Sequence, residues 1–517
     1  MSDTINIFWP GDYRAMPNQT ALPMLEAATA ELEKSLSRLG RKHRRVGGFM
    51  TKPSEAIDAL GPLDGPIVGL YTHWVYGPHT VDGVIGHDHP LLMVSNFSGK
   101  WPGLVGLLNT GACLAAEGRK ASRLWTDATE WSDDQPFLDR LAEWCETGRV
   151  DYDASAVRAA PRASAAAAAL AGKVHEEIRR RRPIALMLGD TSMGMTNGYF
   201  GARLVHRLGF AEHKVDQAWI IDYGKRIADK RLDDALKFVN AKGVTFHYGG
   251  AGAEDFDAAA TREQLRDYLA VLDLVEEFRA DCVGWQYQLG LIKLRPPSDF
   301  AEGLLNSTCR PESNGDTIVD STEADQGNLL PMEMMKRLLK AKGLHQAVMF
   351  HDVRWGAEHD GRFLWVLLNS GSCGAYAFNH DPSTLKGVHS YRQPRQYFPV
   401  PGGTFAGESL PGAITWARAY IKDDTLWMDV GKGEVVRLPA QVRDAWWTGT
   451  TREWPFMAAD LGIGRDTLMA HYLSNHVAVA YGDVFDDMVA LSQELGFKLR
   501  VLGRGLGHGF GSEFGLG

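Results

Sequence analysis

The sequence predicts an α/β protein with two parallel-sheet α/β domains followed by a C-terminal domain that contains an antiparallel β-barrel. Through the first two thirds of the 517 residues, short apolar runs alternate with amphipathic helical stretches. That alternation is typical of parallel strands joined by helices. Beyond residue 343 the apolar runs become shorter, partly alternating, and separated by Gly, Pro and Asp, which indicates antiparallel structure. The chain is also too long for one core and predicts roughly two to four domains.

The first domain is expected to span residues 1–170. Buried strands are predicted at 5–9, 66–70 and 91–94, with helices at about 21–39 and after Pro102. The alanine-rich stretch 156–171 favours helix but cannot build a core, so it is predicted to be a linking helix.

The second domain is expected at 171–342 and the third at 343–517. In the second, a strand at 183–188 precedes amphipathic helices around 233–240, 261–278 and 330–342. In the third, the predicted strands are 363–368, 425–430 and 434–438, and a last strand and helix follow at 477–481 and 484–495. The glycine-rich tail 503–517 is predicted to be mobile or to contact another subunit.

Composition narrows the function classes. A net charge of −9 is mild for this length and argues against a dominant nucleic-acid surface. Five scattered cysteines without a CxxC pair argue against a zinc ribbon or a disulfide framework and fit a reducing cytoplasm. No signal segment and no apolar stretch of about 20 residues is present, so no membrane association is expected. We expect a cytoplasmic protein.

Two acidic residues follow apolar runs on either side of one predicted helix. Glu323 comes after the pair Ile318-Val319, and Asp352 ends the run that begins at Val348. Two parallel strands joined by a right-handed crossover would place both acids at the same edge of one sheet. Neighbouring carboxylates repel, so a shared proton or a cation must neutralise them.

A hard divalent metal suits two carboxylates and one imidazole, and His476 is the candidate imidazole. The residues alone leave alternatives open. An acid at a strand end also serves as a helix cap or an ion-pair partner. With 17 histidines in the chain, one well-placed imidazole is not distinctive.

Three other motifs have two interpretations each. The loop 188–198 follows a strand and could cradle a phosphate, but it has neither GxGxxG nor GxxxxGK[ST]. His79, His87 and His89 could bind metal or be ordinary surface histidines. The aromatic segment 72–77 could stack on a sugar or belong to the core.

Several segments, in the same order along the chain, together resemble L-fucose isomerase, within the L-fucose/L-arabinose isomerase superfamily. These segments are 74–77, 192–195, 322–325, 350–354, 368–371, 397–399, 453–455, 475–476 and 481–483. The resemblance implies two α/β domains followed by a domain with a β-barrel. It also implies a homo-hexamer whose sites form between subunits, with Trp74 and the segment 193–195 contributing across subunits.

The resemblance further implies a site. A divalent ion, usually Mn²⁺ (or Mg²⁺ or Co²⁺), would be held by Glu323, Asp352 and His476, and the two acids would be catalytic. The expected sugar contacts are Arg14, Trp74, Met193, Met195, Gln286, Tyr397, Trp454 and Asn475. The implied activity is aldose–ketose isomerisation of an open-chain sugar through a cis-enediol(ate), with a hydride shift as the mechanistic rival.

Some positions depart from the family pattern: His73, His351 and Trp355 adjoin the expected site. L-Fucose or D-arabinose is the first expected substrate. A C6-modified anionic hexose such as sulfoquinovose is the alternative, because Arg354 and Arg452 favour an anion. A catalytically silent sugar-binding relative and a nucleotide- or phosphate-dependent enzyme are the other classes in play. The expected partners are a small sugar and copies of the chain, without nucleic acid or membrane.

Overall fold

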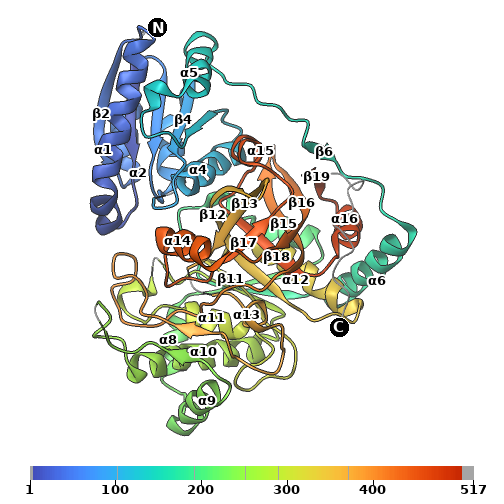
Figure 1. Ribbon diagram of the computed structural model, residues 1–517. Coiled ribbons are helices and arrows are strands. Elements are labelled where there is room, and N and C mark those ends of the chain that lie inside the picture. The colour runs from blue at the N-terminus through green and yellow to red at the C-terminus, as the bar shows by residue number, and fades with distance from the viewer. Residues whose placement is uncertain are drawn as a thin grey trace.

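A computed structural model describes residues 4–101, 103–190, 193–250, 252–288, 290–370 and 372–503, with the side chains of 449 and 450 also outside the description. The tail prediction for 503–517 therefore lies almost wholly outside the described residues. Figure 1 shows an N-terminal layer at one end, a second α/β layer at the other, and a larger sheet between them.

The N-terminal sheet has five parallel strands in the order β2-β1-β3-β4-β5. They are β1 (Ile5–Pro10), β2 (His43–Met50), β3 (Ile67–Tyr71), β4 (Leu91–Asn96) and β5 (Ser122–Thr126). The helices are α1 (Ala15–Arg38), α2 (Pro53–Leu60), α3 (Gly77–Val84), α4 (Leu104–Ala116), η1 (Trp131–Asp133) and α5 (Gln135–Thr147). β3 is buried throughout, as expected of a parallel strand covered on both faces. The predicted strands at 5–9, 66–70 and 91–94 are thus confirmed.

The second sheet has four parallel strands in the order β11-β10-β7-β8. They are β7 (Ile184–Leu188), β8 (Ala211–Val215), β10 (Cys282–Trp285) and β11 (Val319–Thr322). The helices are η2 (Thr196–Gly198), α7 (Gly201–Arg207), α8 (Ala218–Gly224), α9 (Asp229–Ala241), α10 (Ala258–Phe278), η3 (Leu291–Lys293), α11 (Asp299–Leu305) and α12 (Gln326–Ala341). From β7 the chain adds β8 on one side and later β10 on the other. The carboxyl ends of β7 and β10 are therefore a topological switch point, where such sheets bind ligands.

The third sheet is mixed and has eight strands in the order β15-β18-β12-β13-β17-β16-β19-β6, and β15 also pairs with β16. They are β6 (Val157–Ala159), β12 (Val348–His359), β13 (Arg362–Leu368), β15 (Gly412–Lys422), β16 (Thr425–Val435), β17 (Met457–Asp460), β18 (His476–Tyr481) and β19 (Lys498–Leu502). Its helices are α13 (Tyr376–Asn379), α14 (Ala440–Thr450), α15 (Arg465–His471) and α16 (Phe485–Glu494), and a small two-stranded sheet joins β9 (Thr245–Phe246) to β14 (His389–Ser390). The mixed α/β architecture is confirmed. A closed antiparallel barrel remains a prediction: β15 pairs with β16 as well as with β18, but the sheet continues past β16 through the parallel strand β19 to β6.

The alanine-rich stretch is only partly the linking helix that its composition predicts. Its first residues form β6, which pairs with β19, and α6 (Ala165–Arg181) begins after Ser164 caps the helix by accepting a hydrogen bond from Ala167 N. Ala167 and Ala171 of α6 share a buried cluster with Met488 of α16. Tertiary pairing with β19 overrides local helix propensity in the first turn.

The crossover predicted to place Glu323 and Asp352 in one sheet is wrong. β11 belongs to the four-stranded parallel sheet, whereas β12 lies in the eight-stranded sheet between β13 and β18, antiparallel to both. α12 instead packs between the two sheets, touching β11 and β12 as well as β15 and β18. A buried strand, a helix and a second buried strand are compatible with either arrangement, so the hydrophobic pattern does not choose between them.

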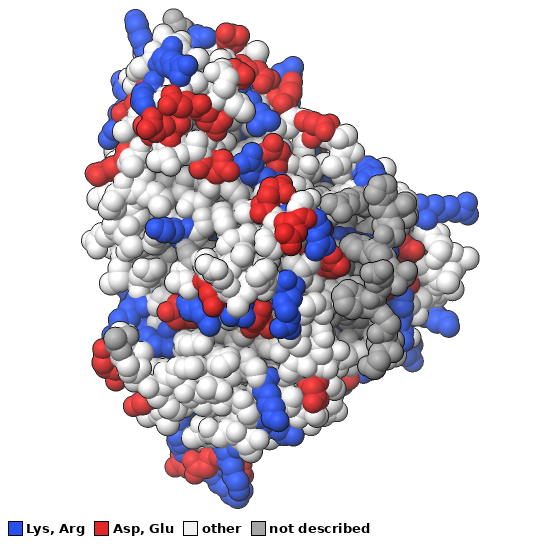
Figure 2. All heavy atoms as spheres, in the orientation of Figure 1, with Lys and Arg blue, Asp and Glu red and all other residues white. Residues whose placement is uncertain are grey.

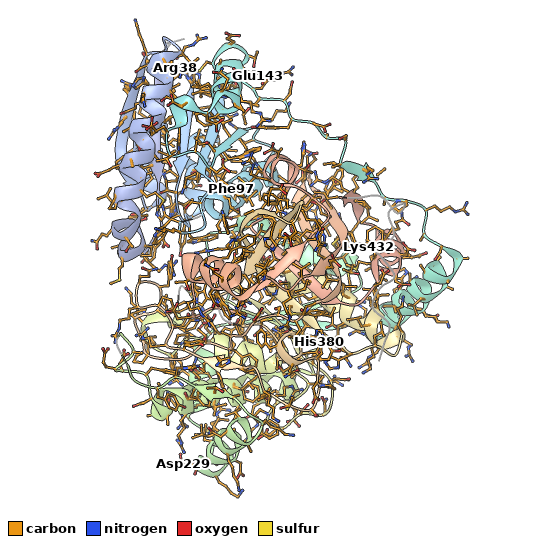
Figure 3. The ribbon with its side chains drawn as sticks, viewed as in Figure 1. Arg38, Phe97, Glu143, Asp229, His380 and Lys432 are labelled. Carbon is orange, nitrogen blue, oxygen red and sulfur yellow. The ribbon has the colours of Figure 1, made fainter. Side chains whose placement is uncertain are left out.

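The N-terminal sheet and the eight-stranded sheet meet through aromatic packing. Phe97, which directly follows β4 and is labelled in Figure 3, lies 6.2 Å from Trp365 of β13 between ring centroids, nearly edge to face. Arg123 of β5 donates to the carbonyl oxygens of Tyr472 (2.7 Å) and Met469 (3.2 Å). These contacts fix the N-terminal sheet against the eight-stranded sheet, whose strands β12 and β18 carry Asp352 and His476.

The surface carries charges of both signs. In the face seen in Figure 2, Lys and Arg are interspersed with Asp and Glu. Within the described ranges, no helix has the length and apolar character needed to cross a membrane.

Candidate active site

One small cavity, with a volume of about 50 Å³, is lined by side chains from all three sheets. The N-terminal layer supplies Arg14 and Trp74, from the loops after β1 and β3, and Val105 from α4. The second layer supplies Met193, Gln288 and Glu323, from the loops after β7, β10 and β11. The eight-stranded sheet and the loops that connect its strands supply the remaining lining residues, which are Asp352, Arg354, Ser370, Tyr397, Phe398, Trp454 and His476.

Glu323 reaches the cavity through a strained turn at the end of β11. Glu323 and Ala324 have positive φ values of 61° and 55°, which are uncommon for residues with a Cβ and concentrate at functional sites. The turn is held because Ala324 N donates to Trp285 O at 3.1 Å. The Glu323 side chain is 9% exposed, and its Oε2 has no hydrogen-bond partner among the described residues. Burial, with Asp352 adding to it against the opposing effects of His476 and Arg14, raises the pKa of Glu323 to about 8.

His476 lies between two carboxylates. Its Nδ1 is 2.7 Å from Asp325 Oδ2, and its Nε2 is 3.1 Å from Asp352 Oδ1. Burial alone would lower the pKa of His476, but Asp352 and Asp325 together raise it to about 9. Because Nδ1 lies against Asp325, the ring is oriented with Nε2 toward Asp352 and the cavity.

Asp325 is itself held by a fully buried cation. Arg418 pairs with Asp325 Oδ2, and both side chains are 0% exposed. Burial would raise the pKa of Asp325, but Arg418 and His476 lower it to about 2. Asp325 also caps α12 by accepting from Gly327 N at 2.8 Å. One carboxylate therefore starts the helix, neutralises Arg418 and orients His476.

Asp352 is placed by strand register. It pairs with His476 across the antiparallel β12–β18 ladder, and its Oδ1 accepts a hydrogen bond from Asn475 Nδ2 at 3.2 Å. Asn475 Oδ1 is buried without a partner among the described residues. Register alone thus brings a carboxylate, an imidazole and a carboxamide together.

The donor set fits a hard divalent cation, because two carboxylates and an imidazole are the ligands such ions take. Glu323 Oε2 has no hydrogen-bond partner among the described residues, and a bound cation would supply one. The 3.1 Å between Asp352 Oδ1 and His476 Nε2 is close to the roughly 3 Å that separates two ligand atoms at right angles around one ion. Within the described part of the chain, however, no three His, Cys, Asp or Glu side chains already stand at metal-holding spacing. Side-chain adjustment would be needed to close Glu323 onto the other two.

The other side chains expected to contact a sugar divide into three groups. Arg14, Trp74, Met193, Tyr397 and Trp454 line this cavity, within a single chain. Asn475 bonds to Asp352 as described above. Met195 is fully buried and Gln286 lines a different cavity, so neither is among the residues that line this one.

Aromatic and cationic groups form the cavity wall. Arg14 is paired with Asp12 at 2.7 Å and lies over the Tyr397 ring at 5.0 Å. The rings of Tyr397 and Trp454 are 5.8 Å apart, and Arg354 lies 5.4 Å from the Trp454 ring. Such a wall presents ring faces and charge to a polar ligand.

Two histidines that depart from the family pattern are buried and carry low pKa values. Burial lowers the pKa of both His73 and His351 to about 4. His73 Nε2 lies 2.9 Å from Asn18 Oδ1, whereas both ring nitrogens of His351 have no partner among the described residues. Both rings are therefore neutral at pH 7. The other histidine motif lies elsewhere: His87 and His89 stack on each other at 5.5 Å and are not among the cavity-lining residues.

Sequence reasoning did not select Asp325 or Gln288 as site residues. Asp325 stands two residues from Glu323 in the same motif, but only the fold shows that it faces His476. Gln288 reaches the cavity because Tyr287, with φ +48°, turns the backbone between it and Gln286. Its Oε1 accepts from Arg14 Nη1 at 3.4 Å.

Comparison with known proteins first identifies a class of protein for the C-terminal part of the chain. Residues 367–502, which include Tyr397, Trp454, Asn475 and His476, match the family model described as L-fucose isomerase, C-terminal domain. A particular relative then extends the match to most of the chain. The L-fucose isomerase of Vibrio vulnificus (strain YJ016) is 24% identical over an alignment of length 492, and the match covers 82% of this chain and 78% of the relative. The resemblance to L-fucose isomerase is therefore confirmed, and it implies an aldose–ketose isomerase.

Proposed function

We propose that this chain is a divalent-metal-dependent isomerase of an open-chain sugar, with L-fucose or D-arabinose as its first expected substrate. One observation carries the proposal: Glu323, Asp352 and His476, from two different sheets, line one cavity, and the buried Glu323 oxygen there has no partner among the described residues. Glu323, Asp352 and His476 would hold the cation. When bound, a divalent ion such as Mn²⁺, Mg²⁺ or Co²⁺ would polarise the sugar carbonyl and stabilise negative charge on the sugar oxygens.

The two acids have separate tasks in this proposal. Glu323, whose carboxylate form the bound cation would favour, removes the proton from C2 and returns it to C1, so that the sugar passes through a cis-enediol. Asp352 moves the hydroxyl proton from O2 to O1, and Asn475 holds that carboxylate in place at 3.2 Å. Each proton lost at one atom is recovered at its neighbour, so aldose and ketose differ only in where the two hydrogens reside.

The remaining residues bind and shield. Trp74, Tyr397 and Trp454 present ring faces to the C–H surface of the sugar. Arg14, fixed by Asp12, positions a sugar hydroxyl. A volume of about 50 Å³ holds a few water molecules rather than a whole hexose. Substrate binding in this proposal therefore requires the cavity to widen.

The resemblance to L-fucose isomerase also supports proposals about the domains, the assembly and the location of the whole protein. We propose domains at 1–170, 171–342 and 343–517, assembly into a homo-hexamer, and a cytoplasmic location. Trp74 and Met193, expected to contribute across subunits, already line the cavity of their own chain, so the proposal does not depend on a contribution from a neighbouring subunit. Light scattering coupled to size-exclusion chromatography measures the assembly directly.

A second substrate class is favoured by one observation. Arg354 lines the cavity, is 8% exposed, and its Nε has no partner among the described residues. A buried guanidinium with a free N–H suits an anionic group, as on a hexose with a sulfonate at C6 such as sulfoquinovose. The reaction would be unchanged.

The test is product formation. The protein is stripped with a chelator, reloaded with Mn²⁺, Mg²⁺ or Co²⁺, and incubated with L-fucose, D-arabinose and sulfoquinovose, and ketose is then measured. The proposal expects ketose only in the reloaded samples, and the preferred aldose identifies the substrate class. A folded, metal-loaded protein that forms no ketose from any of a broad panel of aldoses would favour the sugar-binding alternative. Loss of C2 deuterium to solvent separates proton transfer from a hydride shift, which would retain it.

A further inference from the structure

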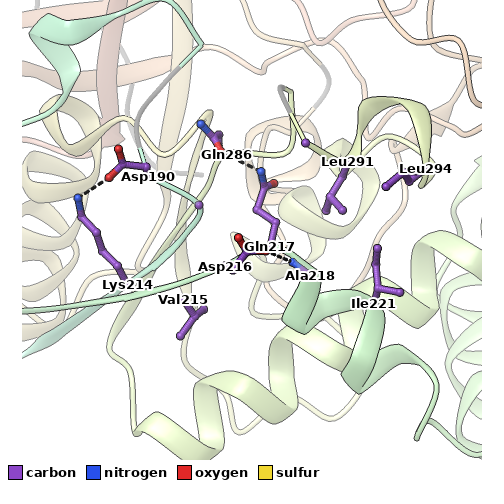
Figure 4. Close-up of a pocket in the computed structure, with 12 residues that line it drawn as sticks. Asp190, Lys214, Val215, Asp216, Gln217, Ala218, Ile221, Gln286, Leu291 and Leu294 are labelled. Atoms are coloured by element: carbon purple, nitrogen blue, oxygen red, sulfur yellow. Dashed lines mark hydrogen bonds and ion pairs between the residues drawn. The ribbon is translucent and has the colours of Figure 1, made fainter.

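A second and larger cavity, of about 610 Å³, opens at the carboxyl edge of the four-stranded sheet. Figure 4 shows the side chains that line it. It is bounded by the ends of β7, β8 and β10 and by α8, and thus sits at the topological switch point described above. None of its lining residues is shared with the cavity that holds Glu323.

The polar centre of this cavity is a pair of carboxamides. Gln217 Nε2 donates to Gln286 Oε1 at 2.8 Å. Gln217 is only 7% exposed, and its Oε1 has no hydrogen-bond partner among the described residues. A buried acceptor of this kind needs a donor, which a ligand or an ordered water supplies.

Glycines bring the backbone close to these carboxamides. A Cβ on Gly189, which has φ +102°, would lie 2.5 Å from Gln286 Oε1, and one on Gly290 would lie 3.0 Å from Gln217 Nε2. Side chains at either position would press on the carboxamides. Glycine at both positions therefore lets the backbone lie directly against the two carboxamides.

The charges in this cavity disfavour an anion. Lys214 Nζ is 2.6 Å from Asp190 Oδ1 and 3.7 Å from Glu212, and it donates to the Tyr199 hydroxyl at 2.9 Å. Its charge is therefore already neutralised, while Asp216 adds a further carboxylate to the lining. The phosphate interpretation of the loop 188–198 gains no support from Gly189 and Asp190. Residues 191 and 192 of that loop lie outside the described residues.

The opposite wall is aliphatic. Ile221, Leu291 and Leu294 line it, on the side of Gln217 away from Lys214 and Asp190 (Figure 4), and Leu294 is 67% exposed. Carboxamides and carboxylates facing an aliphatic wall offer hydrogen bonds to hydroxyls on one side and contact to C–H groups on the other.

We propose that this cavity binds a small, neutral, polyhydroxylated molecule, a free polyol or sugar, one hydroxyl of which donates to Gln217 Oε1. The site is separate from the reaction centre, and the inference does not depend on the proposed function. One backbone turn nonetheless borders both cavities. Gln286 lines this cavity and Gln288 lines the other. Gln288 N donates to Gln286 O at 2.5 Å.

The test is binding stoichiometry with xylitol as the probe. Equilibrium dialysis of the full chain against labelled xylitol measures moles bound per mole of chain for the wild type, Gln217→Leu and Gln493→Leu. Gln217→Leu keeps the side-chain size and removes the acceptor. Gln493→Leu makes the same exchange on the exposed surface of α16. Circular dichroism and thermal unfolding establish that each variant is folded, and Gln217→Asn, which keeps an acceptor, is the fallback if Gln217→Leu is not.

The inference expects Gln217→Leu to bind one xylitol fewer per chain than the wild type, and Gln493→Leu to match the wild type. For Gln217→Asn, used as the fallback, it expects at least tenfold weaker binding at this site. Equal stoichiometry and affinity in all proteins would overturn it. Displacement of the same xylitol by inorganic phosphate would also overturn it, because it would indicate an anion site. Ketose formation by the wild type is measured separately, so a failure of the proposed isomerase activity is not confused with a failure of this site.

Discussion

Replacing Asp325 with Asn tests the buried network behind His476. The exchange preserves the shape of the side chain and its ability to cap α12. It removes the negative charge that neutralises Arg418, whose side chain is 0% exposed. Removing one partner of a buried ion pair leaves an uncompensated charge and costs about 3–5 kcal/mol. With roughly 2–4 °C of melting temperature per kcal/mol for a domain of this size, we expect a decrease of about 6–20 °C.

The assay is thermal unfolding followed by circular dichroism, with Asp483→Asn as the matched control. Asp483 pairs with Lys432 at 3.0 Å, but both side chains are substantially exposed, at 62% and 32%. Exposed pairs contribute about 0–1 kcal/mol. Asp325→Asn combined with Arg418→Met should recover much of the lost stability, because no buried charge is then left unpaired. If Asp325→Asn unfolds within about 2 °C of Asp483→Asn, the reasoning about this network is refuted.

Three further predictions concern single side chains. Glu323→Gln should keep the melting temperature within a few degrees while the rate of ketose formation drops at least about 100-fold, because the group that moves the carbon-bound proton is lost. Near-normal turnover would contradict the role of Glu323 as that base. Trp74→Phe should retain turnover, whereas Trp74→Ala should raise KM about tenfold because a sugar-facing ring is lost. Steady-state kinetics measure both variants, and an unchanged KM in Trp74→Ala would contradict contact between Trp74 and the sugar. Arg123→Met should lower the free energy of unfolding by about 1–3 kcal/mol, because the carbonyl oxygens of Met469 and Tyr472 lose their hydrogen-bond donor. Denaturant unfolding measures this change. Arg149→Met, at an exposed position, is the control and should leave the free energy of unfolding unchanged.

Much of the fold follows from hydrophobic periodicity. The buried strands at 184–188 and 476–481 and the helices at 258–278 and 326–341 all lie where the apolar pattern predicts them. Sheet membership does not follow from that pattern. β11 and β12 show the same apolar run ending in an acid, yet they belong to different sheets, because partner choice depends on contacts far along the chain. β2 was not predicted, since its sequence HRRVGGFM is that of a half-exposed edge strand.

The candidate site was predictable to a similar degree. The motifs around Glu323, Asp352 and His476 drew attention to side chains that line one cavity, although the sheet geometry expected for the two acids was wrong. That they hold a metal remains a prediction. Gln288 was beyond the reach of periodicity, because one positive φ at Tyr287 decides which of two nearby glutamines faces the cavity. Asp325 was hidden because its sequence position, at the start of a helix, is already explained by capping.

The central claim is that two acids and one imidazole bind a single cation. Equilibrium binding of Mn²⁺ to the chelator-stripped chain, compared between the wild type and Asp352→Asn, tests this claim most directly. The account predicts one Mn²⁺ per chain in the wild type and at least about tenfold weaker binding in the variant. Equal Mn²⁺ affinity in the two proteins, or no binding to a folded wild type, would contradict it.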